Sequence, residues 1–516
     1  MDTGCCGEGP VRVSELLRLL VDVVRSDRAA PVVWFKEGSQ RNLKSRDFLM
    51  PKGALNKIFH GEEVPEDLLN KLTSLKVSGV LPIQRCLQNE AGLLVQLDRP
   101  AVFQSVLTDF SLYMKPVPSD NGENSVVLNC APLHSCEGLN ALKLSHLRAV
   151  LVADHLAELL RLAGAQVHLV PKLRNTELQL FLHQLGVSWP FEPEALCVQE
   201  EITAFKKYLK ERDHVNSHDL EQPLNVTDDD LKQVAELQRA VQESRVEGTH
   251  CALLHVVSYE KEFHQQKLDR LFTMLDSGDS APDQKHLICG PVKVLSSSPA
   301  VSCSEYYHLR KTQMLDASVM KYGDLLQGDS LEEIICSLTA AAIKFEMMAT
   351  AQRSQVTLDL EDSSITTKGT KSGAFVMYNC ARLATMFDSY NMAVSQGFYP
   401  EFPPARELNY STLKEEGEWL LLFNYIMTFP EVLSQSAQIL LTSSGSRVTA
   451  STDAVCKFLV NLSMDFSSYY NRVHILGEPL PHLYGQMFAR LQLMKAVQSL
   501  LHAALGTLHL SPLTKI

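Results

Sequence analysis

The sequence predicts an α/β region built on a parallel sheet, preceded by a small α+β region and followed by an all-α region. A strand–helix–strand pattern over residues 125–170 predicts the sheet, and helical periodicity from Leu331 onward predicts the all-α region. Strand-like runs between turns before residue 120 predict the α+β region. A chain of 516 residues suits about three domains, which we place at 1–120, 121–330 and 331–516.

The N-terminal region begins with a predicted helix over residues 11–30, where Val13, Leu16 and Leu20 lie on one face. Gly92–Leu97 is a predicted strand. The turn-rich segment Pro116–Asn124 marks the predicted end of this domain.

A basic segment from Lys36 to Lys57 contains Arg41, Lys44 and Arg46 among aromatic residues. Cations neutralise phosphates and aromatic rings stack on bases, so this composition suits RNA. The alternative is a small folded core whose lysines and arginines are simply solvated. Arg41, Lys44 and Arg46 are the candidate RNA-binding residues here.

The central region contains the pattern of a βαβ unit. Val126–Leu128 is a predicted strand, a helix follows over Ser145–Ala163 with Gly164 as its C-cap, and Gln166–Val170 is the next strand. Further strands at Ala252–Val257 and His286–Cys289 can complete a parallel sheet, and a capping motif at Thr227–Asp230 opens a helix over Leu231–Arg245.

Composition excludes several classes of function. The net charge of −12 disfavours indiscriminate binding to nucleic acid, so DNA is not an expected partner. The 12 cysteines form no C-x-x-C pair, which predicts no zinc site and reduced thiols in the cytoplasm, with the nucleus as a second compartment. No strand precedes a glycine-rich turn, so no nucleotide-type cofactor is expected. No apolar run reaches the ~20 residues that span a bilayer, and Met1–Pro10 lacks the features of a secretory signal.

The block His146–Gly164 (H-L-R-A-V-L-V-A-D-H-L-A-E-L-L-R-L-A-G) resembles the first helix of class I arginyl-tRNA synthetases. The resemblance implies a Rossmann-like catalytic fold for residues 121–330. It also implies a catalytic histidine loop, but the family's His-x-Gly-His is here Lys143-Leu-Ser-His146. Without the glycine, close approach of the backbone to adenine is lost, and a charge-stabilising histidine is missing.

Two other catalytic elements of the family are also eroded. In the segment around Leu315–Gln327, Lys321 is the candidate for the family's pyrophosphate-binding lysine, but the surrounding pattern differs. After Val170, Lys172 and Arg174 stand where the family has an aspartate-rich arginine-binding loop. The resemblance therefore implies a catalytically degenerate relative of the synthetases, and not an enzyme.

The C-terminal region resembles the family's DALR-type anticodon-binding domain. The segments that carry this resemblance are Ala341–Phe345, Val356–Leu360 with Val376–Arg382, Phe429–Leu433, Ala454–Leu462 with its following aromatic residues, and the last helix over Phe488–Leu505. Arginine binds phosphate and tyrosine stacks on unpaired bases. The candidate tRNA-binding residues here are Tyr378, Arg382, Tyr469, Tyr470 and Arg472, with packing inside the domain as the alternative.

The resemblance implies a tRNA-binding subunit that selects arginine tRNAs. It implies that the subunit presents them to a methyltransferase, which forms 3-methylcytidine in the anticodon loop. Two alternatives remain open. His146 and Lys321 are the residues that could support residual synthetase activity, and the net acidity suits a scaffold that does not bind RNA.

Overall fold

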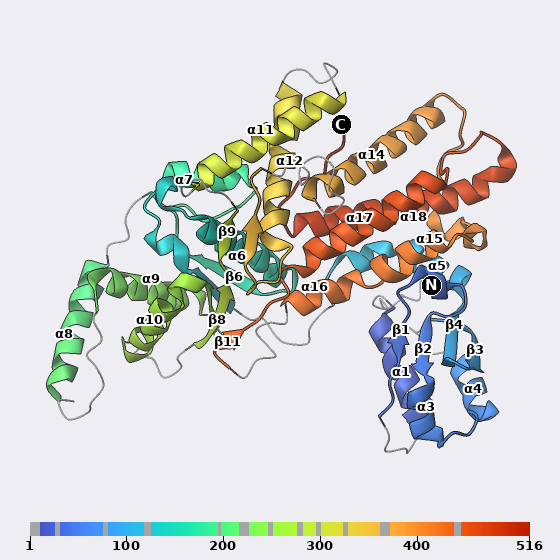
Figure 1. Cartoon of the computed structure of the whole chain (residues 1–516), viewed down its shortest axis with the longest axis horizontal. Coiled ribbons are helices and arrows are strands. Elements are labelled where there is room, and N and C mark those ends of the chain that lie inside the picture. Colours follow the sequence, from blue (N-terminus) through green and yellow to red (C-terminus); the bar gives the residue numbers. More distant parts are fainter. Residues whose placement is uncertain are drawn as a thin grey trace, which may run out of the picture.

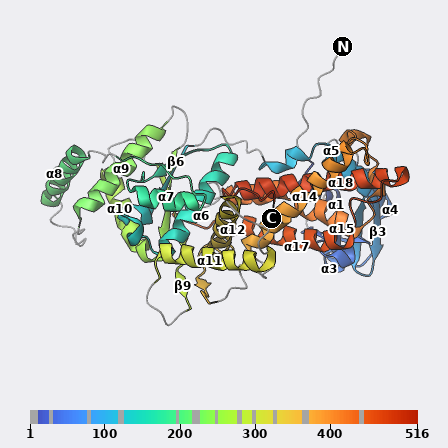
Figure 2. The ribbon, with the colours of Figure 1, turned by 90° about the horizontal axis from the view of Figure 1, so that it is seen from above.

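The computed structural model describes residues 11–25, 31–75, 81–117, 125–193, 198–215, 226–245, 251–275, 282–295, 301–322, 329–361, 372–437 and 445–515. Figure 1 shows the α/β part at one end, the long C-terminal helices in the middle and the N-terminal domain beneath the helices at the other end. The second view gives the same elongated arrangement (Figure 2).

The N-terminal domain is a four-stranded antiparallel sheet in the order β1-β2-β4-β3, flanked by helices. Its strands are β1 (Phe35–Lys36), β2 (Phe48–Pro51), β3 (Ile83–Asn89) and β4 (Gly92–Leu97). Its helices are α1 (Val13–Arg25), α2 (Gln40–Leu43), α3 (Lys52–Phe59), α4 (Glu66–Thr73), α5 (Arg99–Thr108) and the 3-10 turn η1 (Phe110–Met114). A Cβ on Gly92 would lie 2.0 Å from the Met50 carbonyl oxygen, and its φ is +140°, so the β3–β4 turn needs glycine there.

The central domain is a five-stranded parallel sheet in the order β11-β8-β7-β5-β6. Its strands are β5 (Ser125–Cys130), β6 (Gln166–Val170), β7 (Cys251–Ser258), β8 (Asp283–Cys289) and β11 (Arg447–Val448). The helices of this region are α6 (Leu144–Leu162), α7 (Thr176–Gln184), α8 (Gln199–Val215), α9 (Asp228–Ser244), α10 (Glu262–Leu275) and α11 (Cys303–Tyr322). Such a sheet is buried on both faces, and every residue of β5 is buried.

The C-terminal domain is a bundle of long helices. It contains α12 (Asp329–Met348), α14 (Gly373–Ser395), α15 (Glu416–Leu420), the π-helical segment η8 (Leu421–Ile426), α16 (Phe429–Ala437), α17 (Ala454–Arg472) and α18 (Pro481–Gly506). The bundle is closely packed where α14 crosses α12. A Cβ on Gly373 would lie 2.3 Å from the carbonyl oxygen of Ala341, so only glycine fits at this crossing.

The predicted fold class is confirmed, with element bounds close to those expected. Helix α6 covers the predicted helix and ends before Gly164, whose φ is +93°. The capping box at Thr227 and Asp230 is formed. The first helix ends at Arg25, five residues short of the predicted limit, and residues 26–30 lie outside the described residues. Most of the predicted boundary at Pro116–Asn124 also lies outside them.

Two short parallel strand pairs join the bundle to the α/β domain, and the sequence predicted neither. Strand β10 (Val356–Leu358) pairs with β9 (Val292–Val294), and β11 extends the sheet beside β8. Segments of two or three residues carry no readable alternation, so periodicity cannot find them. Backbone hydrogen bonds between short strands therefore connect the α/β domain with the C-terminal helical domain.

Candidate nucleic-acid interface

Arg382 of α14 and Tyr470 of α17 form a pair at the surface of the bundle. The Arg382 guanidinium carbon lies 5.3 Å from the centroid of the Tyr470 ring, and its Nη1 donates to Ser467 Oγ at 3.2 Å. The Tyr470 ring also packs on Phe466, with centroids 5.5 Å apart. Both members of the pair are half-buried. The pair therefore presents a cation and an aromatic ring together, as binding to an unpaired base and its phosphate requires.

Tyr470 also borders a small surface hollow of about 200 Å³. Its other lining residues include Thr385, Ser389 and His474, which carry polar side chains. Arg472 follows at the exposed end of α17, where its Nε donates to the carbonyl of Ser468 at 3.1 Å. Tyr378 lies on α14 one turn before Arg382 and is half-buried. These positions suit contact with RNA, and their role stays a prediction.

Tyr469 does not belong to this surface, which corrects the prediction made from the sequence. Its side chain is 1% exposed, and its hydroxyl donates to Glu418 Oε1 at 3.2 Å. Gly417 allows the ring to approach, since a Cβ there would lie 2.9 Å from Tyr469 Cδ2. Adjacent residues of a helix point about 100° apart, so Tyr470 reaches the surface while Tyr469 packs in the core.

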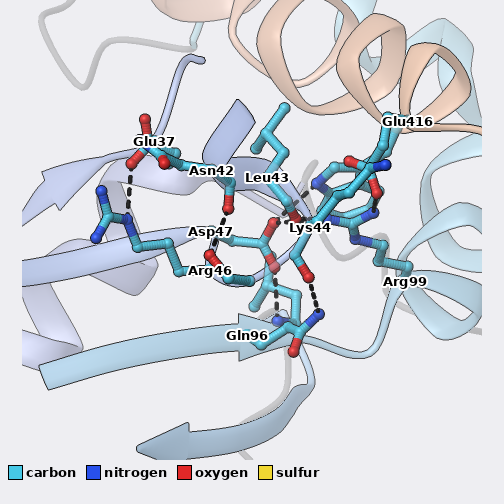
Figure 3. A network of polar contacts seen from close by, with 12 residues as sticks. Glu37, Asn42, Leu43, Lys44, Arg46, Asp47, Gln96, Arg99 and Glu416 are labelled. Atoms are coloured by element: carbon cyan, nitrogen blue, oxygen red, sulfur yellow. Dashed lines mark hydrogen bonds and ion pairs between the residues drawn. The ribbon is translucent and has the colours of Figure 1, made fainter. Parts of the chain in front are cut away.

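The basic segment of the N-terminal domain divides into exposed and paired cations. Arg41 and Lys44 are exposed. Arg46 is half-buried, and its Nε donates to Glu37 Oε2 at 2.8 Å (Figure 3). The carboxylate neutralises most of the Arg46 charge in place, so Arg46 is a weaker candidate for phosphate binding than its neighbours.

The sequence did not single out Arg85, which joins this basic surface. Arg85 is exposed on β3, and its Nε donates to Gln96 Oε1 at 2.6 Å. The Gln96 amide in turn donates to the carbonyl of Lys44 at 3.5 Å. The antiparallel pairing of β3 with β4 thus brings Arg85 beside Lys44, although 41 positions separate them in the chain. Alternation along β3 could not have shown it, because Gln84 and Arg85 are both exposed where the register shifts after Ile83.

Asp47 locks the N-terminal domain onto the helical bundle. Its Oδ1 accepts from Trp419 Nε1 at 2.8 Å, and its Oδ2 accepts from the Leu97 backbone N–H at 2.8 Å. Arg99 lies beside it, 3.6 Å from Asp47 Oδ1 and 3.0 Å from Glu416 Oε1 (Figure 3). Burial raises the pKa of Asp47 to about 6.

Lys36 makes a second contact between these two domains, so it is not part of an exposed basic strip. Its Nζ donates to Asn424 Oδ1 at 2.7 Å and lies 4.1 Å from the centroid of the Phe423 ring. Burial lowers its pKa to about 8. Phe423 and Asn424 both belong to the π-helical segment η8, which therefore forms part of the interface.

A polar cavity of about 450 Å³ lies where β5 and β6 end, the place at which Rossmann-like folds bind their ligands. Its walls include His134, Lys172, Arg174, Asp230, Glu236 and His264. Arg174 Nη2 donates to Glu236 Oε1 at 2.7 Å, so a cation of the chain itself is paired inside the cavity. His134 Nδ1 lies 3.4 Å from the same carboxylate.

His146 does not line this cavity. Its side chain is buried, its Nδ1 lies 3.8 Å from Cys136 Sγ, and burial lowers its pKa. The side chain of Lys321 lies outside the described residues. Lys172 pairs with Glu192 at 3.2 Å. The geometry therefore does not bring His146 and Lys172 together on a shared ligand.

The described residues contain nine free cysteines, and no helix among them is long and apolar enough to cross a membrane. Most of these thiols are buried in the core, which agrees with the packing role expected for them.

Two family models match the chain. One is "DALR, N-terminal domain", over residues 11–113, and the other is "DALR anticodon binding domain", over residues 376–516. The surfaces described above at Arg41, Lys44 and Arg85, and at Arg382 and Tyr470, lie within these two matched segments.

Solved structures share the fold of almost the whole chain. The arginyl-tRNA synthetase of Thermus thermophilus has a TM-score of 0.65 at 15% identity, and covers 98% of this chain and 100% of its own. The enzyme of Plasmodium falciparum has a TM-score of 0.57 at 13% identity, and covers 99% of this chain and 100% of its own. The class of protein is therefore one with an arginyl-tRNA synthetase fold and a DALR anticodon-binding domain.

Curated relatives define the family more closely. The Mus musculus protein named "DALR anticodon-binding domain-containing protein 3" is 45% identical, and the match covers 94% of this chain and 96% of the relative. The Danio rerio protein of the same name is 40% identical, with 98% and 99% covered. The chain belongs to the family of DALR anticodon-binding domain-containing protein 3.

Proposed function

We propose that this protein is a non-catalytic tRNA-binding subunit. It recognises arginine tRNAs through their anticodon region and presents them to a separate tRNA methyltransferase, which forms 3-methylcytidine in the anticodon loop. The reaction takes place in the cytoplasm, with the nucleus as a second compartment. The subunit needs no cofactor of its own for this role.

The observation that carries the proposal is the pair of Arg382 and Tyr470 beside a small hollow on the DALR domain. Proteins read RNA mainly at unpaired loop bases, which stack on aromatic rings while arginine binds the neighbouring phosphate. The exposed cations Arg41, Lys44 and Arg85 supply a second surface for the tRNA backbone. The overall acidity of the chain does not oppose this role, because the local field at the contact governs binding.

The state of the synthetase-like cavity supports a role in binding and not in catalysis. Arg174 occupies the Glu236 carboxylate, which would otherwise be available to a cationic substrate. His146 is buried behind Cys136 in the wall of the cavity and does not line it, so it is not placed to stabilise charge on a bound nucleotide.

The test of tRNA recognition is direct binding of the purified full-length protein to a panel of tRNAs at several salt concentrations, with and without the methyltransferase. We expect arginine tRNAs to bind at least tenfold more tightly than the rest, with affinity falling as salt rises. Equal affinity for all tRNAs, or no binding, would contradict the proposal and favour a scaffold.

The test of the methyltransferase role is reconstitution. A 3-methylcytidine tRNA methyltransferase is assayed on an arginine tRNA transcript with and without this protein, and a serine tRNA serves as the control substrate. We expect methylation of the arginine tRNA alone to rise. Unchanged methylation in a mixture that binds the tRNA would disprove the presenting role while leaving tRNA recognition intact.

Residual synthetase activity is the second candidate, and the cavity of about 450 Å³ at the sheet edge is the observation that favours it. Arginine-dependent exchange of pyrophosphate into ATP measures it directly. Exchange that depends on arginine and exceeds the level of a reaction without the protein would overturn the non-catalytic proposal.

A further inference from the structure

Three potential metal ligands lie together in the α/β domain, away from the surfaces described above. His255 of β7 and His286 of β8 are directly opposite each other in the parallel register, with ring centroids 5.3 Å apart. Asp269 projects from α10 toward both. His286 Nε2 contacts Asp269 Oδ2, and His255 Nε2 lies 3.5 Å from Asp269 Oδ1. One donor atom from each of the three residues lies within 4.8 Å of the other two.

Two buried polar atoms beside this cluster make no well-formed hydrogen bond among the described residues, although His255 interacts with both Gln284 and Asp269. One is Nε2 of His255, whose side chain is 1% exposed. The other is Oε1 of Gln284, two residues before His286 on β8. The Gln284 amide nitrogen donates to Thr273 at 3.3 Å, which holds the side chain over α10. Buried polar atoms are nearly always paired in folded proteins, so two atoms in one place without a well-formed hydrogen bond are available to a ligand.

A surface hollow of about 460 Å³ gives access to the cluster. Asp269, Gln284 and His286 form part of its lining, with Thr273 and Ser446. An ion can therefore reach Asp269, Gln284 and His286 from solvent, while His255 lies behind them and is not part of the lining.

We propose that His255, Asp269 and His286 bind a divalent transition-metal ion, with the carbonyl oxygen of Gln284 as a fourth ligand. Two imidazoles and a carboxylate are a common protein ligand set for Zn²⁺, and they also suit other first-row ions. The carboxylate offsets part of the charge that the ion brings into the buried site. The ion ties β7, β8 and α10 together in this site.

The hydrogen bonds of His255 adapt to the ion through amide rotation. Its Nδ1 lies 2.9 Å from the Asn129 amide and 3.1 Å from that of Gln265. A metal on Nε2 places the ring proton on Nδ1, which then donates to Asn129 once that amide turns over. The turned Asn129 donates to His134 Nε2, now 2.8 Å from its oxygen. The Gln265 amide nitrogen, now 3.1 Å from Nδ1 and 3.0 Å from Asp269 Oδ1, turns away from the protonated Nδ1.

This chain of contacts reaches the polar cavity. His134 is a wall of the cavity and lies 3.4 Å from Glu236. The ion therefore orients His134 through His255 and Asn129, which are positioning residues for that wall. Cysteine spacing predicted no zinc site. The ligands proposed here are two histidines and an aspartate that come from β7, β8 and α10, so no spacing along the sequence reveals them.

The experiment uses the full-length protein, freed of metal with a chelator and then titrated with Zn²⁺ and, separately, with Co²⁺. We expect one equivalent to bind, with a visible Co²⁺ spectrum that has no thiolate charge-transfer band. Asp269→Asn and His286→Gln keep size and hydrogen bonding, and we expect each to weaken binding at least tenfold. His264→Gln on the same helix α10 is the matched control, because His264 faces Asp230 and not the cluster.

Circular dichroism of each variant shows that it is folded before the metal is added. Binding that survives in both Asp269→Asn and His286→Gln would overturn the proposal, as would a thiolate band or no binding by the wild-type protein. In that case a water molecule satisfies His255 and Gln284, and the cluster is a buried ion pair.

Discussion

Arg382 and Tyr470 limit each other's motion, and this supports their proposed role in binding an RNA base. The guanidinium carbon of Arg382 lies 5.3 Å from the centroid of the Tyr470 ring, and its Nη1 donates to Ser467 Oγ. Little side-chain entropy remains to be lost when RNA binds, because both groups are already positioned. Arg46 differs, since Glu37 binds its guanidinium.

We expect Arg382→Gln and Tyr470→Ala each to weaken tRNA binding by about 5- to 150-fold, the range for loss of about 1–3 kcal/mol from a stacked base or a phosphate contact. The matched control is Arg46→Gln, which should change affinity less than about twofold, because Arg46 pairs with Glu37. Filter binding or fluorescence anisotropy measures all three. Equal losses in all three variants would mean that the Arg382–Tyr470 pair has no special role.

Asp47 is the residue that most directly holds the N-terminal domain in place. Asp47→Asn puts an amide N–H₂ group against the N–H donor of either Trp419 or Leu97. We expect unfolding to become easier by about 2 kcal/mol or more, the cost of an unsatisfied buried donor. Thermal unfolding followed by circular dichroism measures the loss. Asp109→Asn, at an exposed position without a capping hydrogen bond, should leave the midpoint unchanged.

At the scale of the element, helix α6 contacts both the loop after α12 and the C-terminal end of the chain. Its buried Arg148 donates to five backbone carbonyls, those of Gly290, Met347, Thr350, Ala351 and Ser354. Near its middle, Asp154 pairs with His509 at 2.9 Å and His155 Nδ1 donates to the Thr507 carbonyl at 2.7 Å. The segment His146–Gly164 therefore forms a surface on which the loop after α12 and the C-terminal end of the chain pack.

We expect Arg148→Met to destabilise the protein by about 3 kcal/mol or more, because several buried carbonyls lose a charged donor at once. Arg161→Met is the control on the same helix. Arg161 is exposed, and its single ion pair, with Glu158 at 3.7 Å, is a surface contact that contributes little to stability. The midpoints of thermal unfolding compare the two. Equal midpoints would show that the loop after α12 holds its place without Arg148.

The length of an element decides whether the sequence alone predicts it. Helices α6, α9, α17 and α18 and strands β4 to β8 follow patterns long enough to read. Strands β9, β10 and β11 are too short to read, and their pairing depends on contacts between distant segments. The sequence predicted both Tyr469 and Tyr470 as tRNA-binding residues. Neither composition nor periodicity shows that the Glu418 carboxylate lies beside the Tyr469 hydroxyl in the core.

At the scale of the whole molecule, the C-terminal end of the chain packs on α6 through Thr507 and His509. The stability of this contact depends on pH. Burial lowers the pKa of His155 to about 4. Between about pH 6.5 and pH 4 the unfolded chain binds a proton there and the folded chain does not, so stability falls as pH falls. His509 acts in the opposite sense. Its hydrogen bond with Asp154 raises its pKa, so its stabilisation is present at low pH and is lost as pH rises through the folded value.

We expect His155→Asn to reduce the acid sensitivity of unfolding, by up to about 1.4 kcal/mol per pH unit over that range. Asparagine can still donate to the carbonyl of Thr507 but cannot be protonated. Unfolding midpoints measured in steps from neutral pH to pH 4 test this. His308→Asn, at an exposed position on α11, should leave the slope unchanged. If both variants retain the slope of the wild-type protein, burial of His155 does not control it.

The sequence by itself determined the fold class, the order of the main elements and the likeness to an anticodon-binding domain, because these depend on local periodicity and ordered motifs. The tertiary structure decided which candidate residues are accessible. It buried Tyr469, paired Arg46 and Arg174 with carboxylates, turned Lys36 toward Phe423 and brought Arg85 beside Lys44. The reason is physical: the charge and exposure of a side chain depend on neighbours that are distant in sequence, and only folding brings them together.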